Sequence, residues 1–189
     1  MSNANLQDFS DSVVEEFIEK AGLDVEFNSD AFIQRFLQLE LLQKTEDNVE
    51  PTGWGLLLFG ERPQFVYHNA LIRATYQSES FGERTENFEG PLVKQSKNAI
   101  DWFSEIIGYH ESRAKAERER VYNYPPEVIR EALTNAVAHR NYDIDGAPIH
   151  FWVNDEFIEI KSPGKPAPPI HLQEIKNFQA TVLSRNPKV

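Results

Sequence analysis

The stretch EVIREALTNAVAHRNY, residues 127–142, decides how the C-terminal part of the chain is interpreted. Its apolar residues have the spacing of one helix face, and at about 100° per residue they fill an arc of roughly 180°. They are Val128, Ile129, Ala132, Leu133, Ala136 and Val137. Three hydrogen-bonding side chains, Glu131, Asn135 and His139, recur every fourth residue along the border of that arc. The sequence therefore predicts an amphipathic helix with a polar line at the edge of its buried face.

The polar line has two interpretations. A carboxylate and an amide one helical turn apart can orient a water and ligate Mg²⁺, a hard cation that prefers oxygen ligands. Alternatively, the line is a helix rim whose polar groups bond to solvent or to a neighbouring loop. Spacing alone leaves both interpretations open.

The segments around this helix predict an α+β fold. APIHFWV and EFIEI alternate as two strands within residues 147–160, joined by a turn at Asn154 and Asp155. SPGKPAPP, residues 162–169, is a Pro/Gly loop, and IHLQEIKNF after it has helical spacing. An order of long helix, hairpin, glycine loop and helix is typical of a layered α+β domain.

Upstream segments predict further elements. NALIRATYQ alternates as a strand from Ala70 to Gln77, SESFGERTENFEGPL is polar and predicts a loop, and VKQSKNAIDWFSEII has helical spacing. In residues 1–60 we expect an acidic helical segment, with helices at 11–22 and from Ser29 through LQLELL. Thr52 is expected to cap a short helix that ends at Gly60. A small winged-helix-like unit over 25–60 is an alternative, disfavoured by the acidic charge.

Composition excludes several classes of function. The net charge is −11, and residues 1–60 hold 3 Lys and Arg against 12 Asp and Glu, which argues against non-specific DNA binding by this chain alone. The absence of Cys excludes disulfides, thiolate zinc and a cysteine nucleophile, and suits a reducing cytoplasm. The longest apolar run, LLLF, is far too short for a membrane span, and the first residues lack a signal-peptide pattern. The sequence therefore predicts a cytoplasmic protein with no membrane partner.

The motif EALTNAVAH, residues 131–139, and the segments around it resemble two known groups of proteins. EALTNAVAH resembles the N-box of the Bergerat-fold (GHKL-like) ATPases, such as gyrase B, MutL and histidine kinases. The longer run YPPEVIREALTNAVAHRNYDIDGAPIHFWVNDEFIEIKSPG is similar to the C-terminal ATPase-like domain of bacterial transcriptional regulators labelled RecG-related ATP-dependent DNA helicases. PTGWGLLLFGERPQ, FEGPL and SRNP also resemble that branch. The resemblance implies an incomplete two-layer helix/mixed-sheet Bergerat-like sandwich over 61–189, preceded by a small helical segment with a strand.

The resemblance implies roles for the polar line. Glu131 falls on the family's catalytic base, which activates the water that attacks the γ-phosphate. Asn135 falls on the ligand of Mg²⁺, and His139 lies where relatives place a basic or polar residue near the phosphates. The implied cofactors are therefore ATP and Mg²⁺. A histidine at a helix end can also simply face the C-terminal dipole.

The resemblance also assigns nucleotide-binding roles to Ser162, Gly164 and Lys165, although the loop departs from the family pattern. Where relatives have Asn-Pro-Gly-Gly, Ser162 replaces the Asn and Lys165 replaces the second Gly. Gly164 keeps a position at which positive φ carries no steric cost, and Lys165 could meet a phosphate. An Asp-x-Gly-x-Gly box for adenine is missing, and an ordinary Pro-rich turn is the alternative.

The expected function is ATP binding, with or without weak hydrolysis, in a regulatory domain of a RecG-related transcriptional regulator. Relatives contact DNA through a Schlafen/AlbA-like domain that this chain does not show, and the second glycine box would follow residue 189, so we expect a longer protein. No G-x-x-x-x-G-K-[ST] motif is present, which excludes a motor helicase built from this chain. Two alternatives remain: a non-catalytic interaction or dimerisation module that forms a homo-oligomer, and an anti-sigma-factor-like serine kinase.

Overall fold

The computed structural model describes residues 4–46, 48–79, 82–114 and 125–166, together with residues 173 and 177. The helices are α1 (Asp11–Lys20), α2 (Asp30–Gln38), α3 (Gly53–Phe59), α4 (Leu92–Ala114) and α5 (Pro126–His139). The strands are β1 (Leu42–Lys44), β2 (Val49–Pro51), β3 (Ile72–Ser78), β4 (Gly82–Phe88), β5 (Ile149–Asn154) and β6 (Ile158–Lys161). Two short 3₁₀ helices are η1 (Leu6–Asp8) and η2 (Pro63–Phe65). The predicted α+β fold class is confirmed.

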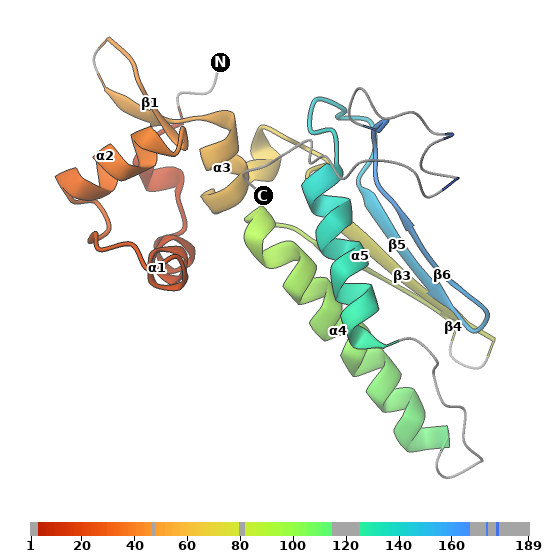
Figure 1. Cartoon of the computed structure of the whole chain (residues 1–189). Helices are drawn as coiled ribbons and strands as arrows, with labels where there is room; N and C mark the ends of the chain where they lie inside the picture. The colour runs from red at the N-terminus through yellow and green to blue at the C-terminus, as the bar shows by residue number, and fades with distance from the viewer. Residues whose placement is uncertain are drawn as a thin grey trace.

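Four strands form a mixed sheet in the order β4-β3-β5-β6. β3 pairs antiparallel with β4 and parallel with β5, and β5 pairs antiparallel with β6. α4 and α5 pack against each other and cover one face of this sheet (Figure 1). A helical layer therefore lies on one face of a sheet layer.

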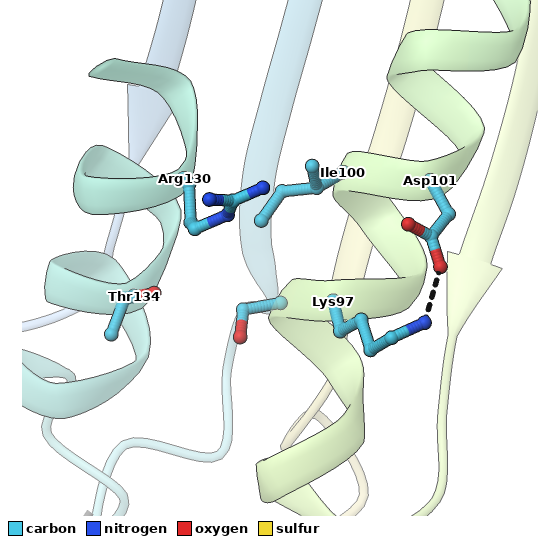
Figure 2. A pocket seen from close by; sticks show the side chains of 6 residues that line it. Lys97, Ile100, Asp101, Arg130 and Thr134 are labelled. Atoms are coloured by element: carbon cyan, nitrogen blue, oxygen red, sulfur yellow. Dashed lines mark hydrogen bonds and ion pairs between the residues drawn. The ribbon is translucent and has the colours of Figure 1, made fainter. Parts of the chain in front are cut away.

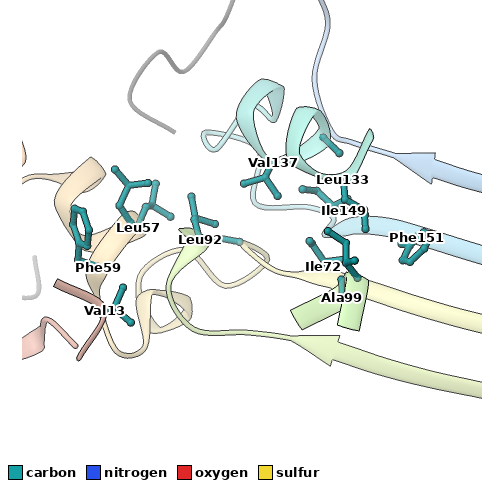
Figure 3. Close-up of a cluster of buried hydrophobic side chains, with 14 of the residues drawn as sticks. Val13, Leu57, Phe59, Ile72, Leu92, Ala99, Leu133, Val137, Ile149 and Phe151 are labelled. Carbon is teal, nitrogen blue, oxygen red and sulfur yellow. The ribbon is translucent and has the colours of Figure 1, made fainter. Parts of the chain in front are cut away.

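The core between the layers follows from alternation along the strands. In β3, Ile72, Ala74 and Tyr76 are buried, whereas the residues between them point to the other face. Figure 3 shows Ile72, Ile149 and Phe151 from the sheet beside Leu133 and Val137 of α5. One continuous hydrophobic cluster extends from here to the N-terminal elements, so the two predicted regions share a core.

The N-terminal elements α1, α2, the β1–β2 hairpin and α3 are built around packed aromatic rings. Phe17 contacts Phe36 and Phe59 edge-on, with ring centroids 6.0 and 5.0 Å apart. Thr52 caps α3 by accepting a hydrogen bond from Gly55 N, as predicted. A Cβ at Gly55 would lie 2.0 Å from the Leu41 carbonyl oxygen, so only glycine allows α3 to approach the hairpin this closely.

Two local predictions are wrong. Residues 82–88 were expected in a loop but form β4, because an edge strand exposed along its length needs no apolar alternation. The second helix was expected to run through Leu42, but α2 ends at Gln38 and Leu42 begins β1, because Glu40 adopts a left-handed φ of 54° that the helix cannot continue through. Of the predicted C-terminal helix only Gln173 and Asn177 are described, and Asn177 N donates to the Gln173 carbonyl at 3.0 Å. The rest of that segment and the SRNP motif lie outside the described residues. Among the described helices, none is both long and apolar enough to cross a bilayer.

Candidate functional site

Helix α5 carries the predicted polar line. It begins at Pro126, where a proline is tolerated because the first helical N–H groups have no intrahelical acceptor. Its buried face consists of Ile129, Leu133, Ala136 and Val137, which pack toward the sheet and α4. The buried arc is narrower than the periodicity predicted, because Val128 is 56% exposed.

The polar line is exposed rather than half buried. Glu131, Asn135 and His139 all lie on the solvent side of α5. Asn135 Nδ2 donates a hydrogen bond to Glu131 Oε1 at 3.0 Å. The predicted pairing of a carboxylate with an amide therefore exists, and Asn135 Oδ1 and Glu131 Oε2, which take no part in that bond, are the oxygens able to ligate a cation.

The first half of the glycine loop is fastened to the C-terminal end of α5. Asn141 N donates to the Pro163 carbonyl at 2.8 Å, and Ser162 Oγ donates to the Ala136 carbonyl at 2.8 Å. The second bond satisfies a carbonyl in the last turn of the helix, where intrahelical donors run out. The structure thus brings Ser162 to the same end of α5 as His139.

Gly164 makes the close approach possible. Its φ is +134°, a backbone conformation that disfavours side chains, and a Cβ there would lie 3.1 Å from Asn141 Cβ. Lys165 follows with its side chain exposed. Residues 167–169 of the predicted loop lie outside the described residues.

Arg140 fixes the end of α5 from inside. Its side chain is 1% exposed, and its Nη2 donates to the carbonyls of Asn69, Ile144 and Ala147, each at 3.0 Å. The guanidinium carbon lies 4.8 Å from the ring centroid of Tyr142. Burial lowers the pKa of Arg140, and the electrostatic interactions with Tyr142 and Asp145 oppose part of this shift.

Tyr142 completes this anchor. Its hydroxyl donates to the Val137 carbonyl at 2.9 Å, and burial raises the pKa of the phenol well above its usual range. These contacts give Arg140 and Tyr142 a packing role. Together they set where α5 ends and where the segment before β5 begins.

The donor set of the polar line fits Mg²⁺ better than a transition metal. Within the described residues, no group of three or more His, Asp or Glu side chains could hold a metal. Mg²⁺ is commonly bound by one or two protein oxygens, with phosphate and water oxygens completing the shell. Asn135 Oδ1 and the Glu131 carboxylate could supply such ligands, but they could not form a complete site.

Sequence reasoning missed a groove between α4 and α5. It has a volume of about 350 Å³ and is lined by Ser96, Lys97, Ile100, Asp101, Arg130 and Thr134. Figure 2 shows the Arg130 side chain extending from α5 toward Ile100 of α4, with Lys97 bonded to Asp101 at 2.7 Å. Glu131 and Asn135 do not line this groove. The spacing of Arg130 and Thr134, one turn apart, is the only sequence signal for it.

Comparisons with known proteins identify the fold but no family. No family model matches the chain, and no curated protein matches it. A solved structure, that of the DIP2311 protein from Corynebacterium diphtheriae, is similar with a TM-score of 0.59 at 16% sequence identity. The similarity covers 98% of this chain and 35% of that one, so the chain spans about a third of that protein's length. Helices, sheet and N-terminal elements thus occur together in a solved protein whose sequence is very different.

Proposed function

We propose that the chain is part of an ATP-binding regulatory domain of the Bergerat type, in a RecG-related transcriptional regulator. The observation that carries this proposal is the Glu131–Asn135 pair, joined at 3.0 Å on the exposed side of α5. The loop 162–164, fastened to the end of the same helix, supports it. The resemblance of EALTNAVAH to the N-box assigns chemistry to these positions.

Each residue of the line would have one task. Asn135 Oδ1 would ligate Mg²⁺, which neutralises phosphate charge when bound. Glu131 would hold and polarise a water, and its hydrogen bond from Asn135 already fixes the carboxylate relative to the helix. His139, one turn further toward the loop, would donate to a phosphate oxygen.

The loop would contribute mainly backbone groups and one cation. The Ser162 hydroxyl already donates to the Ala136 carbonyl, so it serves the helix end rather than a phosphate. The Lys165 side chain is exposed and would meet the phosphate chain. Gly164 keeps the backbone next to Asn141 free of a side chain.

The proposed role in the cell is to couple nucleotide state to DNA contacts made by another domain of the same protein in the cytoplasm. This chain would itself contact no DNA, since its net charge of −11 repels a phosphate backbone.

Calorimetry with ATP and Mg²⁺ tests the proposal, on this chain and on the full-length protein that contains it. We expect Asn135→Ala to weaken Mg²⁺-dependent ATP binding by about ten-fold or more, a loss of one charge-assisted ligand. Glu131→Gln should keep binding and lose any hydrolysis. Thr134→Ala, the neighbouring change that faces the α4–α5 groove, should leave affinity unchanged.

Equal affinity of the wild-type and Asn135→Ala full-length proteins for ATP with Mg²⁺ would overturn the assignment. So would the absence of any binding by the full-length protein at millimolar nucleotide.

A second candidate is a non-catalytic interaction module that kept the fold and lost the nucleotide site. Two observations favour it: the polar line is exposed outside the α4–α5 groove, and the Ser162 hydroxyl is bonded within the chain. This candidate predicts no thermal shift with ATP and Mg²⁺, together with self-association.

A further inference from the structure

The free edge of the sheet at β4 has the features of a self-pairing surface. β4 stands at one end of the strand order, so its outer edge pairs with no other strand among the described residues. It is seven residues long, and six of its residues are exposed. A free edge presents unpaired N–H and C=O groups that a further strand can bond.

Its charges show which strand would fit. β4 has the sequence GERTENF, with Arg84 and Glu86 two residues apart on the same face and Thr85 between them. Charges on a free edge usually repel a second strand, and a row of one sign would do so here. Opposite signs placed symmetrically about one residue do the reverse for a strand of the same sequence.

We propose that β4 pairs antiparallel with β4 of a second copy of this chain, about a two-fold axis at Thr85. In that register Arg84 lies opposite the second copy's Glu86, and Glu86 lies opposite its Arg84, so the symmetry makes both contacts at once. The outcome is a continuous eight-stranded sheet with the helices of both copies on one side.

The charges of β4 also disfavour the neighbouring registers of this strand pair. Side chains alternate between faces, so a shift that keeps each residue on its own face moves the strands by a two-residue step. One such step places Arg84 against Arg84, and the opposite step places Glu86 against Glu86. Like charges directly opposite each other destabilise a strand pair. Of these three registers, only the one centred on Thr85 therefore avoids repulsion.

Contacts within one copy leave these side chains available. The Arg84–Glu86 pair within the chain is long, 4.0 Å, and the side chains are 55% and 47% exposed. On the other face, Thr85 Oγ1 lies 3.1 Å from Thr75 Oγ1 of β3. Pairing about Thr85 extends this threonine row into the second copy, where hydroxyl pairs stabilise adjacent strands.

Analytical ultracentrifugation of the 189-residue chain over a range of concentrations tests the proposal. We expect a reversible dimer, because a single strand pair buries less surface than a permanent interface. Arg84→Glu creates two Glu–Glu oppositions and should weaken dimerisation about ten-fold or more. The double variant Arg84→Glu/Glu86→Arg restores opposite charges in the same register and should return the wild-type dimerisation constant.

Lys44→Glu on β1, an exposed charge reversal in the other sheet, is the matched control and should leave dimerisation unchanged. Hydrogen exchange gives an independent readout, in which amides of residues 82–88 become more protected as concentration rises. Circular dichroism verifies that each variant is folded.

Three results would overturn the proposal. They are a chain that stays monomeric at all concentrations, a dimer unaffected by Arg84→Glu, which would place the interface elsewhere, and a double variant that fails to recover. None of these depends on nucleotide, so the proposed ATP site and the proposed edge pairing can fail separately.

Discussion

Helix α5 has a buried face that packs in the core and an exposed face that carries the polar line. Leu133, at 0% exposure, joins the core beneath the helix, whereas Asn135, two residues later, is exposed and bonded only to Glu131 within the described chain. The buried face is determined by what lies under it, and a change there disturbs the whole layer. Packing does not determine which residues stand on the exposed face. The hydrogen-bonded pair of a carboxylate and an amide there is therefore better explained by chemistry than by packing.

The largest expected effect comes from the buried face. Leu133→Ala should lower the free energy of unfolding by about 2–5 kcal/mol, because it removes buried methyl groups and leaves a cavity. Urea denaturation followed by circular dichroism measures this change. The matched change on the exposed face, Asn135→Ala, should stay within about 0.5 kcal/mol of wild type. Similar losses in both variants would contradict the division between the faces.

An intermediate loss of stability is expected from changes at Arg140, the residue that follows the last turn of α5. Arg140→Met removes the donor to three carbonyls and should lower the free energy of unfolding by about 1.5–3 kcal/mol. Arg140→Lys keeps the charge with fewer donors and should fall between Met and wild type. Urea denaturation tests this order, and a Met variant as stable as wild type would show that those carbonyls find other donors.

The smallest effect concerns an exposed ionic contact, where solvent screens the charges. Lys20 and then Lys94 hydrogen-bond to Glu16 and lower the pKa of its carboxyl from 4.5 to about 2. A group with a lowered native pKa stabilises the fold above its unfolded pKa and loses that contribution as the carboxyl is protonated. Stability should therefore fall slightly as pH drops from about 4.5 toward 2, and Glu16→Gln should flatten that part of the profile. Thermal melts between pH 2 and 7 measure the difference, and parallel profiles would count against it.

Sequence patterns predicted the elements that have one buried face. Ile72, Ala74 and Tyr76 alternate with polar residues, and β3 was predicted within two residues of its observed ends. β4 was missed because Glu83, Arg84 and Glu86 give an edge strand no apolar signal. The apolar pattern of a sequence reflects which residues are buried. A strand that is paired in a sheet but mostly exposed therefore has almost no apolar pattern.

The sequence predicted that two side chains of the polar line lie together, but it did not predict what surrounds them. The i, i+4 spacing of Glu131 and Asn135 correctly placed the two side chains together. The periodicity put them at the border of the buried arc, but it could not show that Val128 would also remain exposed. Nor could it show that the Ser162 hydroxyl would bond to the Ala136 carbonyl, since that contact depends on where a distant loop returns. Both features depend on tertiary contacts between segments distant in the sequence, which a local sequence pattern cannot predict.

The parallel pairing of β3 with β5 has a consequence for the order of folding. Ile72 aligns with Ile149, so the centre of the sheet joins segments separated by the whole of β4, α4 and α5. Closing so long a loop costs entropy before any contact offsets it, which slows folding relative to local pairing. During synthesis on the ribosome, β3 would emerge and pair with β4 well before β5 is made. The edge of β3 that pairs with β5 would therefore stay unpaired during that time. The central strand of the finished sheet is thus the most vulnerable strand of the nascent chain.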